Sequence, residues 1–159
     1  MSIFPTTVLL ATDGSEAASS ATEVAVEISS KTNSELHVIH VYGGAPIYPL
    51  YPEATYPGGT ELEDPVLEEE LESMSEQRAR EVLDAAVEEV QSAGGTVAQA
   101  HLREGTAPHE IVALAEDTGV GLIVVGSRGH GGIRRALMGS VSDAVVRHAH
   151  CPVLVVRNH

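Results

Sequence analysis

The sequence predicts an α/β fold, a single domain in which one parallel sheet of five strands carries helices on both faces. Short apolar runs rich in β-branched residues alternate along the chain with longer segments of helical periodicity. The length of 159 residues suits one domain, residues 1–159. Because crossovers between parallel strands are right-handed, the intervening helices are expected on both sides of the sheet.

Five apolar runs are the predicted strands. They are short and rich in valine, leucine and isoleucine, as strands buried on both faces are. The runs are Thr7–Ala11, residues 35–41, residues 96–102, residues 122–125, which the chain enters from Val120, and Val153–Val156.

The first two predicted helices follow the first two strands. The first begins after residues 12–15, where Asp13 or Ser15 can cap it. The second is a long acidic helix over residues 64–93, ended by Gly94-Gly95. Helical spacing gives their inward-facing residues. These are Ala17, Ala21, Val24, Ala25 and Ile28 in the first, and Leu67, Leu71, Met74, Leu83, Val87 and Val90 in the second.

The last two predicted helices begin at recognisable corners. One has Pro108 in its first turn, where a missing N–H is tolerated. The other begins after Gly139-Ser140, with Asp143 expected as a capping-box partner of Ser140. The expected buried residues are Ile111, Val112, Leu114 and Ala115 in one, and Val141, Ala144, Val145, Val146 and Ala149 in the other.

A segment rich in tyrosine, proline and glycine, residues 42–63, separates the second strand from the second helix. Prolines at this density are incompatible with regular helix or sheet, so we predict a long structured loop. Its tyrosines can pack against a ligand site, a partner or the core of the protein.

The composition is acidic, with a formal net charge of −14. This charge disfavours nucleic acid as a partner, because phosphates would be repelled. No apolar run is long enough to span a membrane, and the amino terminus has no basic region of the kind that precedes a signal peptide. A single cysteine, Cys151, fits a reducing cytoplasm. Abundant carboxylates with one lysine, Lys31, lead to the hypothesis of a halophilic source.

A glycine-rich loop between the fourth strand and the last helix predicts a phosphate site. Its spacing is Gly126-x2-Gly129-x9-Gly139-Ser140. It contains no lysine, which excludes a Walker A loop, and Arg134 stands where a dinucleotide fingerprint needs its last glycine. Free N–H groups at a helix N-terminus attract anions, and glycines allow close approach of the backbone. Five of the eight arginines follow Val125, with a single acid, so this region is locally positive.

This loop, an ATDGS segment at residues 11–15 and a carboxyl-terminal PVLVV together resemble the universal stress protein family in its ATP-binding branch. The resemblance implies the strand order 3-2-1-4-5 of an adenine nucleotide alpha hydrolase-like fold. It implies adenine near Val41 and Thr12, and ribose near Asp13 and Gly126. The implied phosphate ligands are backbone N–H groups around the loop, with charge from two of its side chains. These N–H groups belong to Gly129, His130, Ser140, Val141 and Ser142, with Arg128 or His130 for charge and the hydroxyls of Ser140 and Ser142 as further donors. Gly139 is part of the implied site because a side chain there would occupy the phosphate space.

The implied function is that of a stress-response regulator that binds ATP, with Mg²⁺ or Mn²⁺ held mainly by phosphate oxygens, and hydrolyses it little or not at all. The family also implies a homodimer through strand Val153–Val156. Two alternatives stay open: a dimeric interaction module that binds no nucleotide, and a slow ATPase. Asp13 has two compatible roles, as a helix cap or beside the nucleotide. The cluster His148, His150 and Cys151 has no second cluster at metal-ligand spacing, so we expect no zinc there.

Overall fold

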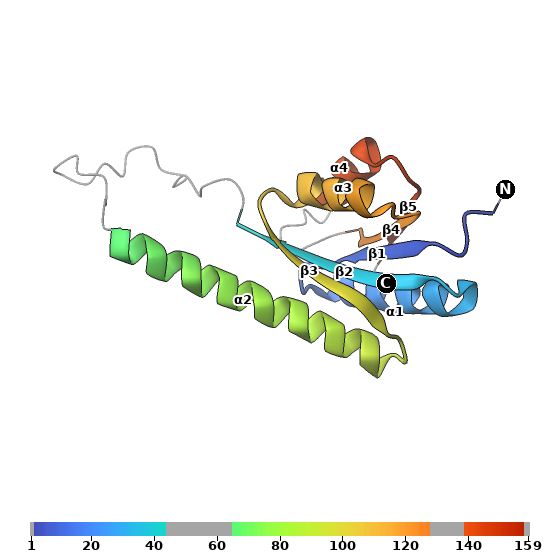
Figure 1. Ribbon diagram of the computed structural model, residues 1–159, viewed down its shortest axis with the longest axis horizontal. Coiled ribbons are helices and arrows are strands. Elements are labelled where there is room, and N and C mark those ends of the chain that lie inside the picture. Colours follow the sequence, from blue (N-terminus) through green and yellow to red (C-terminus); the bar gives the residue numbers. More distant parts are fainter. Residues whose placement is uncertain (1, 44–64, 128–138, 158–159) are drawn as a thin grey trace.

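Five parallel strands form one sheet in the order β3-β2-β1-β4-β5, as predicted (Figure 1). The computed structural model describes residues 2–43, 65–127 and 139–157. The strands are β1 (Thr7–Ala11), β2 (Glu35–Tyr42), β3 (Val97–Glu104), β4 (Leu122–Gly126) and β5 (Val153–Val156).

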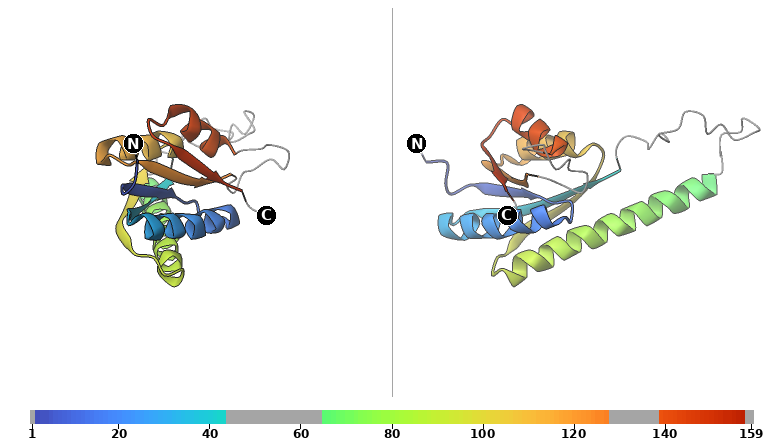
Figure 2. Two further views of the ribbon diagram at one scale, coloured as in Figure 1. Left: turned by 90° about the vertical axis from the view of Figure 1, so that its right-hand side faces the viewer. Right: turned by 180° about the vertical axis from the view of Figure 1, so that it is seen from behind.

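Two layers of helices cover the two faces of the sheet (Figure 2). On one face lie α1 (Glu16–Thr32) and α2 (Pro65–Ser92), and on the other lie α3 (Ala107–Thr118) and α4 (Ser140–His148). The helix after β1 and the helix after β4 therefore lie on opposite faces. A switch of this kind between neighbouring strands opens a crevice beyond their carboxyl ends, which is where open α/β sheets bind ligands.

Burial is greatest at β1, the middle strand. Val8, Leu9 and Leu10 have no exposed surface. Val8 and Leu10 belong to the core cluster under α1 and α2, whereas Leu9 belongs to the cluster under α3 and α4. This alternation follows from the two-residue period of a strand, and it explains why β1 is apolar from Val8 to Ala11.

The helix caps differ in part from the prediction. Ser15, one of two candidates, caps α1, and its Oγ accepts from the Ala18 N–H at 3.3 Å. The capping box in α4 is wrong: Gly139 is the N-cap and Ser140 is already helical, so no side chain caps this helix. Asp143 pairs instead with Arg147 at 3.1 Å, one turn further on.

In the amino-terminal half of α2, Leu71 and Met74 were wrongly predicted to be buried, while the Leu67 side chain lies outside the described residues. Leu71 and Met74 are 56% and 63% exposed, and burial begins only at Ala79. The reason is length: 28 residues of helix extend about 42 Å, whereas the eight residues of β2 extend about 26 Å. The helix therefore projects beyond the sheet, as Figure 1 shows.

Two further apolar residues, in α4, are also more exposed than predicted. Val141 and Val146 are 40% and 44% exposed, while Val145 is fully buried and Ser142 is 3% exposed. A helix of nine residues that covers the sheet along one edge buries only a narrow stripe.

Gly126, the last residue of β4, lies so close to α1 that it has no room for a side chain. A Cβ there would lie 2.9 Å from the carbonyl oxygen and 3.0 Å from the carbonyl carbon of Ala17. Backbone atoms cannot rotate away as a side chain can. The glycine therefore fixes the close approach of β4 and α1.

We expect Gly126→Ala to lower the free energy of unfolding by about 1–3 kcal/mol, the usual cost of overpacking a core. Urea unfolding followed by circular dichroism measures the change. Gly94→Ala is the control, because a Cβ at Gly94 meets nothing within 4 Å and reports only the cost of a positive φ. A Gly126→Ala protein as stable as the parent would contradict this packing argument.

Candidate functional site

The residues proposed for ligand binding gather where β1, β2 and β4 end and α4 begins. Those ends come from segments far apart in the sequence, and the sheet order brings them together at one edge. Arg128, Gly129 and His130 lie outside the described residues.

Thr12 is held by three hydrogen bonds at the end of β1. Its N–H donates to the Ile39 carbonyl at 3.0 Å, and its Oγ1 accepts from the Gly14 N–H at 3.2 Å. Its carbonyl accepts from Nδ1 of His40 at 2.8 Å, so that nitrogen carries the proton. Gly14 has a φ of +81°, which a glycine adopts without strain. Hydrogen bonds within the turn and to β2 therefore hold the turn after β1 in place.

Asp13 lies in this turn, partly exposed, with Oδ1 accepting from the Ser15 N–H at 2.9 Å. Since Ser15 supplies the cap of α1, Asp13 is not needed for that purpose. Asp13 follows the carboxyl end of β1, which pairs with β4.

Val41 continues β2 beyond the end of β1. The last pair between the two strands joins Ala11 to Ile39. Alternate residues of a strand direct their N–H and C=O groups to the same neighbour. Because the Ile39 carbonyl accepts from Thr12 on the side of β1, the main-chain groups of Val41 face the space beyond β1. One donor and one acceptor are thus presented side by side, next to the turn that carries Asp13.

Ser127, which the sequence analysis passed over, holds the two ends of the glycine loop together. Its carbonyl accepts from the Gly139 N–H and from Oγ of Ser142, the latter at 3.2 Å. Its own N–H donates to the Val156 carbonyl at 2.8 Å. The glycine spacing drew attention away from this buried serine, although a small polar residue directly after a strand is a signal for such a bond.

The Ser142 hydroxyl was predicted as a donor to phosphate and is instead directed at protein. It lies within 3.1 Å of the Gly139 carbonyl and 3.2 Å of the Ser127 carbonyl. The predicted role of this hydroxyl is therefore corrected. The backbone N–H groups at the start of α4 differ from this hydroxyl. The first hydrogen bond within α4 runs from the Asp143 N–H to the Gly139 carbonyl, and the N–H groups of residues 140–142 precede it.

A hollow of about 340 Å³ lies between the N-termini of α3 and α4. Both helices direct the positive end of their dipoles toward it. At α3 the N-cap is Thr106, whose side chain makes no cap hydrogen bond, and Gly105 donates its N–H to the Tyr42 carbonyl at 2.9 Å. This helix start was not among the predicted site residues. The residues that line the hollow are Gly43, Gly105, Thr106, Ala107, Pro108, Ser140 and Val141.

The titratable groups near this hollow include an ion pair and a tyrosine. Glu110 and Arg103 form an ion pair at 3.5 Å behind the start of α3. Partial desolvation and the carboxylates of Glu76 and Glu104 raise the pKa of Tyr42, which stays neutral. Within the described ranges no three His, Cys, Asp or Glu side chains are grouped so that they could hold a metal ion. Among the same residues, no helix has the length and apolarity needed to cross a membrane.

Comparison with known sequences gives consistent matches along the chain. The chain is 33% identical over 150 residues to the Universal stress protein MJ0531 of Methanocaldococcus jannaschii, covering 94% of this chain and 81% of that one. It is 32% identical over 149 residues to the Universal stress protein YxiE of Bacillus subtilis, covering 94% and 97%.

Solved structures agree with the fold. The universal stress protein UspA from Lactobacillus plantarum superposes with a TM-score of 0.74 at 27% identity, over 97% of this chain and 99% of that one. A universal stress protein solved in complex with cAMP gives 0.64 at 25% identity, over 97% and 98%. The model of the Universal stress protein family matches residues 5–157. On these grounds, and with the strand order found here, the chain belongs to the universal stress protein family.

Proposed function

We propose that this protein binds an adenine nucleotide, ATP, at the crevice beyond β1 and β4 and acts as a nucleotide-dependent regulator in a stress response. The observation that carries the proposal is the position of Val41. Its main-chain donor and acceptor face the space beyond β1, and adenine presents a matching N1 acceptor and N6 donor on one edge. The related protein solved with cAMP also supports an adenine ligand.

In the proposed complex the base lies against Val41 and Thr12. The ribose hydroxyls donate to the Asp13 carboxylate and lie near Gly126. The phosphates extend to the start of α4, where N–H groups and the helix dipole stabilise negative charge. The proposed phosphate ligands are the N–H groups of Gly129, His130, Ser140, Val141 and Ser142, with Arg128 as a source of positive charge. Gly139 belongs to the proposed site as a residue whose lack of a side chain leaves room for the phosphates.

A divalent cation, Mg²⁺ or Mn²⁺, is proposed to accompany the phosphates. Magnesium often keeps several waters and is held by phosphate oxygens with few protein ligands. The chain's part is then to hold the phosphates, through backbone N–H groups that carry no charge of their own.

We also propose a homodimer through β5. This strand pairs with β4 on one side and is the last strand of the sheet, so its other edge has no neighbour within the described sheet. All four residues, Val153–Val156, are only half-buried. An apolar edge strand of this kind is a template for pairing with a second copy.

The first test concerns recognition of the base. We expect ATP to bind at least tenfold more tightly than inosine triphosphate, whose base replaces the N6 donor with an oxygen and the N1 acceptor with a donor. The Val41 carbonyl would then face an oxygen, and an unpaired polar group costs about 1–3 kcal/mol. Isothermal titration calorimetry gives both dissociation constants.

Gly129→Val combined with Gly139→Val supplies the control, because bulk in the loop should abolish ATP binding with an unchanged circular dichroism spectrum. Equal affinity for the two nucleotides would overturn the role of Val41. Failure to bind any nucleotide, with none released on denaturation, would instead favour an interaction module without nucleotide.

The second test concerns turnover. Phosphoryl transfer needs a positioned nucleophile and charge neutralisation at the γ-phosphate. The loop has no lysine, and its nearest carboxylate, Asp143, is paired with Arg147. We expect phosphate release with Mg²⁺ or Mn²⁺ to be far slower than the typical enzyme value of about 10 s⁻¹. Turnover near that value that is lost in His130→Ala would identify the protein as an ATPase.

The third test concerns assembly. Val155→Lys should convert a dimer into a monomer, because a charge in the middle of the paired edge is left without water or a partner. Light scattering at micromolar concentration measures the mass. Val66→Lys, at a position 61% exposed on α2, should stay dimeric. A parent protein that is monomeric at this concentration would refute the proposal.

A further inference from the structure

Helix α2 carries a buried apolar stripe and, on the adjacent face, a second stripe that is apolar except for Arg78. One consists of Ala79, Leu83, Ala86 and Val90, which are buried against the sheet. The other consists of Leu71, Met74, Arg78, Val82 and Ala85, at spacings of three and four residues that place them along one side of the helix. Since residues 78, 82 and 85 each precede a member of the buried stripe by one position, the second stripe lies about 100° around the helix from the first.

The second stripe, here called the outer strip, is largely exposed. Leu71 and Met74 are 56% and 63% exposed, Arg78 and Ala85 are exposed, and Val82 is half-buried. Scattered exposed apolar residues are ordinary, but a line of them continuing from a projecting helix toward the body of a protein indicates a contact surface.

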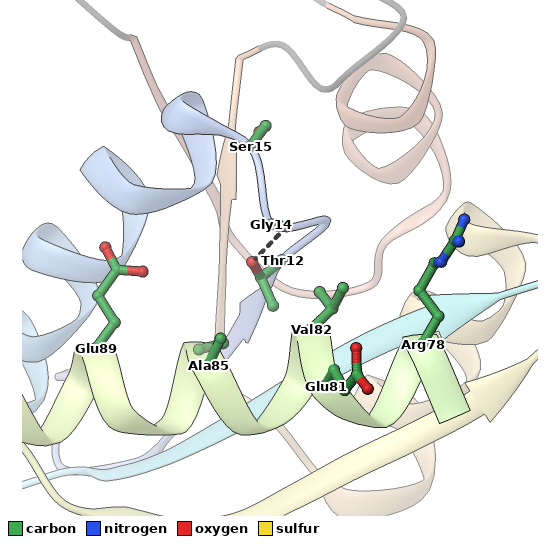
Figure 3. A pocket seen from close by; sticks show the side chains of 9 residues that line it. Thr12, Gly14, Ser15, Arg78, Glu81, Val82, Ala85 and Glu89 are labelled. Atoms are coloured by element: carbon green, nitrogen blue, oxygen red, sulfur yellow. Dashed lines mark hydrogen bonds between the residues drawn. The ribbon is translucent and has the colours of Figure 1, made fainter. Parts of the chain in front are cut away.

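At its inner end the outer strip enters a pocket of about 280 Å³ between α2 and the turn after β1 (Figure 3). Figure 3 shows Val82 and Arg78 extending from α2 on the side of Thr12 and Gly14. The turn lies directly over the strip, since a Cβ at Gly14 would be 3.3 Å from Cγ1 of Val82. The strip is therefore a track, apolar except for Arg78, that leads from the projecting half of α2 to this pocket.

Carboxylates dominate the borders of the track. Glu81 and Glu89 line the pocket with Arg78, which gives this pocket more acids than bases. Glu70, Glu81 and Glu88 are exposed and follow one another at intervals of three and two helical turns, along the edge beyond Met74. The other arginine of this part of α2, Arg80, forms an ion pair with Glu76 at 3.1 Å.

We propose that the outer strip binds a short amphipathic helix of a partner protein, apolar on one face and lined by lysine or arginine along one edge. Apolar anchors at helical spacing fit the line of Leu71, Met74 and Val82, as in other helix-in-groove complexes. Basic side chains meet the row of glutamates, and this complementarity favours such a partner. A second copy of this chain fits less well, because it would bring the same glutamates against one another.

The test uses a synthetic helical peptide with leucines at helical spacing and lysines along one edge, titrated into the full-length protein by fluorescence anisotropy. A peptide of the same composition in scrambled order, which has no apolar face, is the matched control. We expect the amphipathic peptide to bind and the scrambled one to bind at least tenfold more weakly.

Leu71→Glu and Met74→Glu separate the contribution of apolar contacts to peptide binding from that of charge. Each substitution adds an acid while it removes an apolar anchor of the strip. Both side chains are exposed, so folding should be unaffected. Each variant should weaken peptide binding at least tenfold. Val66→Glu is the control for charge, because Val66 is 61% exposed on the same projecting half but lies about 140° around the helix from Leu71. It adds an acid four residues before Glu70 without removing an anchor, so it should bind at least as tightly as the parent protein.

Tighter binding by Leu71→Glu or Met74→Glu, or equal binding of the scrambled peptide, would show attraction by charge alone and overturn the proposal. No binding by the parent protein would overturn it as well. Self-association of the parent protein that Met74→Glu abolishes and Val155→Lys does not would identify a second copy as the occupant of the strip, and would also overturn it.

Discussion

Burial of β1 between two helical layers is the constraint on which the rest of this structure depends. Three consecutive residues, Val8, Leu9 and Leu10, have no exposed surface, and they contribute to both core clusters. A strand buried this deeply fixes its neighbours β2 and β4 by hydrogen bonding. Because β1 has only five residues and β2 has eight, β2 continues past it. The crevice, and the exposed main chain of Val41 within it, follow from that difference in length.

The structure depends next on the contacts that join the sheet to the two ends of the glycine loop. Gly126 brings β4 against the backbone of α1, and the next residue, Ser127, bonds to both β5 and the start of α4. One carbonyl thus joins the two ends of an 11-residue segment, residues 128–138. Whatever that segment binds, its ends are held at the edge of the sheet where Asp13 and Val41 lie. Preorganised ends reduce the entropy lost when a loop closes on a ligand.

The acidity of the chain and the length of α2 together explain the exposed surface of that helix. The net charge of −14 is concentrated in part along α2, whose run of glutamates lies at the solvent-exposed end of the helix. A helix longer than the sheet it covers must leave part of itself unsupported by the core, and here that part keeps apolar residues among its charges. Acidic side chains around apolar ones keep such a surface soluble while leaving it able to select a partner by charge.

The sequence by itself determined the element types, their order and the glycine spacing on which the proposed phosphate site rests, because periodicity and glycine spacing are local properties. The parallel sheet follows that prediction, and its strand order is the one that the family resemblance implied. Helix α4 begins at Ser140, one residue earlier than predicted. It also assigned too much burial to Leu71, Met74, Val141 and Val146, since periodicity shows that a helix has an apolar face but not how far the sheet beneath it extends.

Only the tertiary structure decided the features that depend on residues distant in sequence. The clash that requires glycine at 126 comes from Ala17, and the carbonyl that anchors Ser142 belongs to Ser127. The hollow at the start of α3 exists because α4 begins beside it. Each of these contacts joins segments at least 15 positions apart or depends on where one strand ends relative to another. Local sequence carries no measure of either, because both are set by how the layers pack.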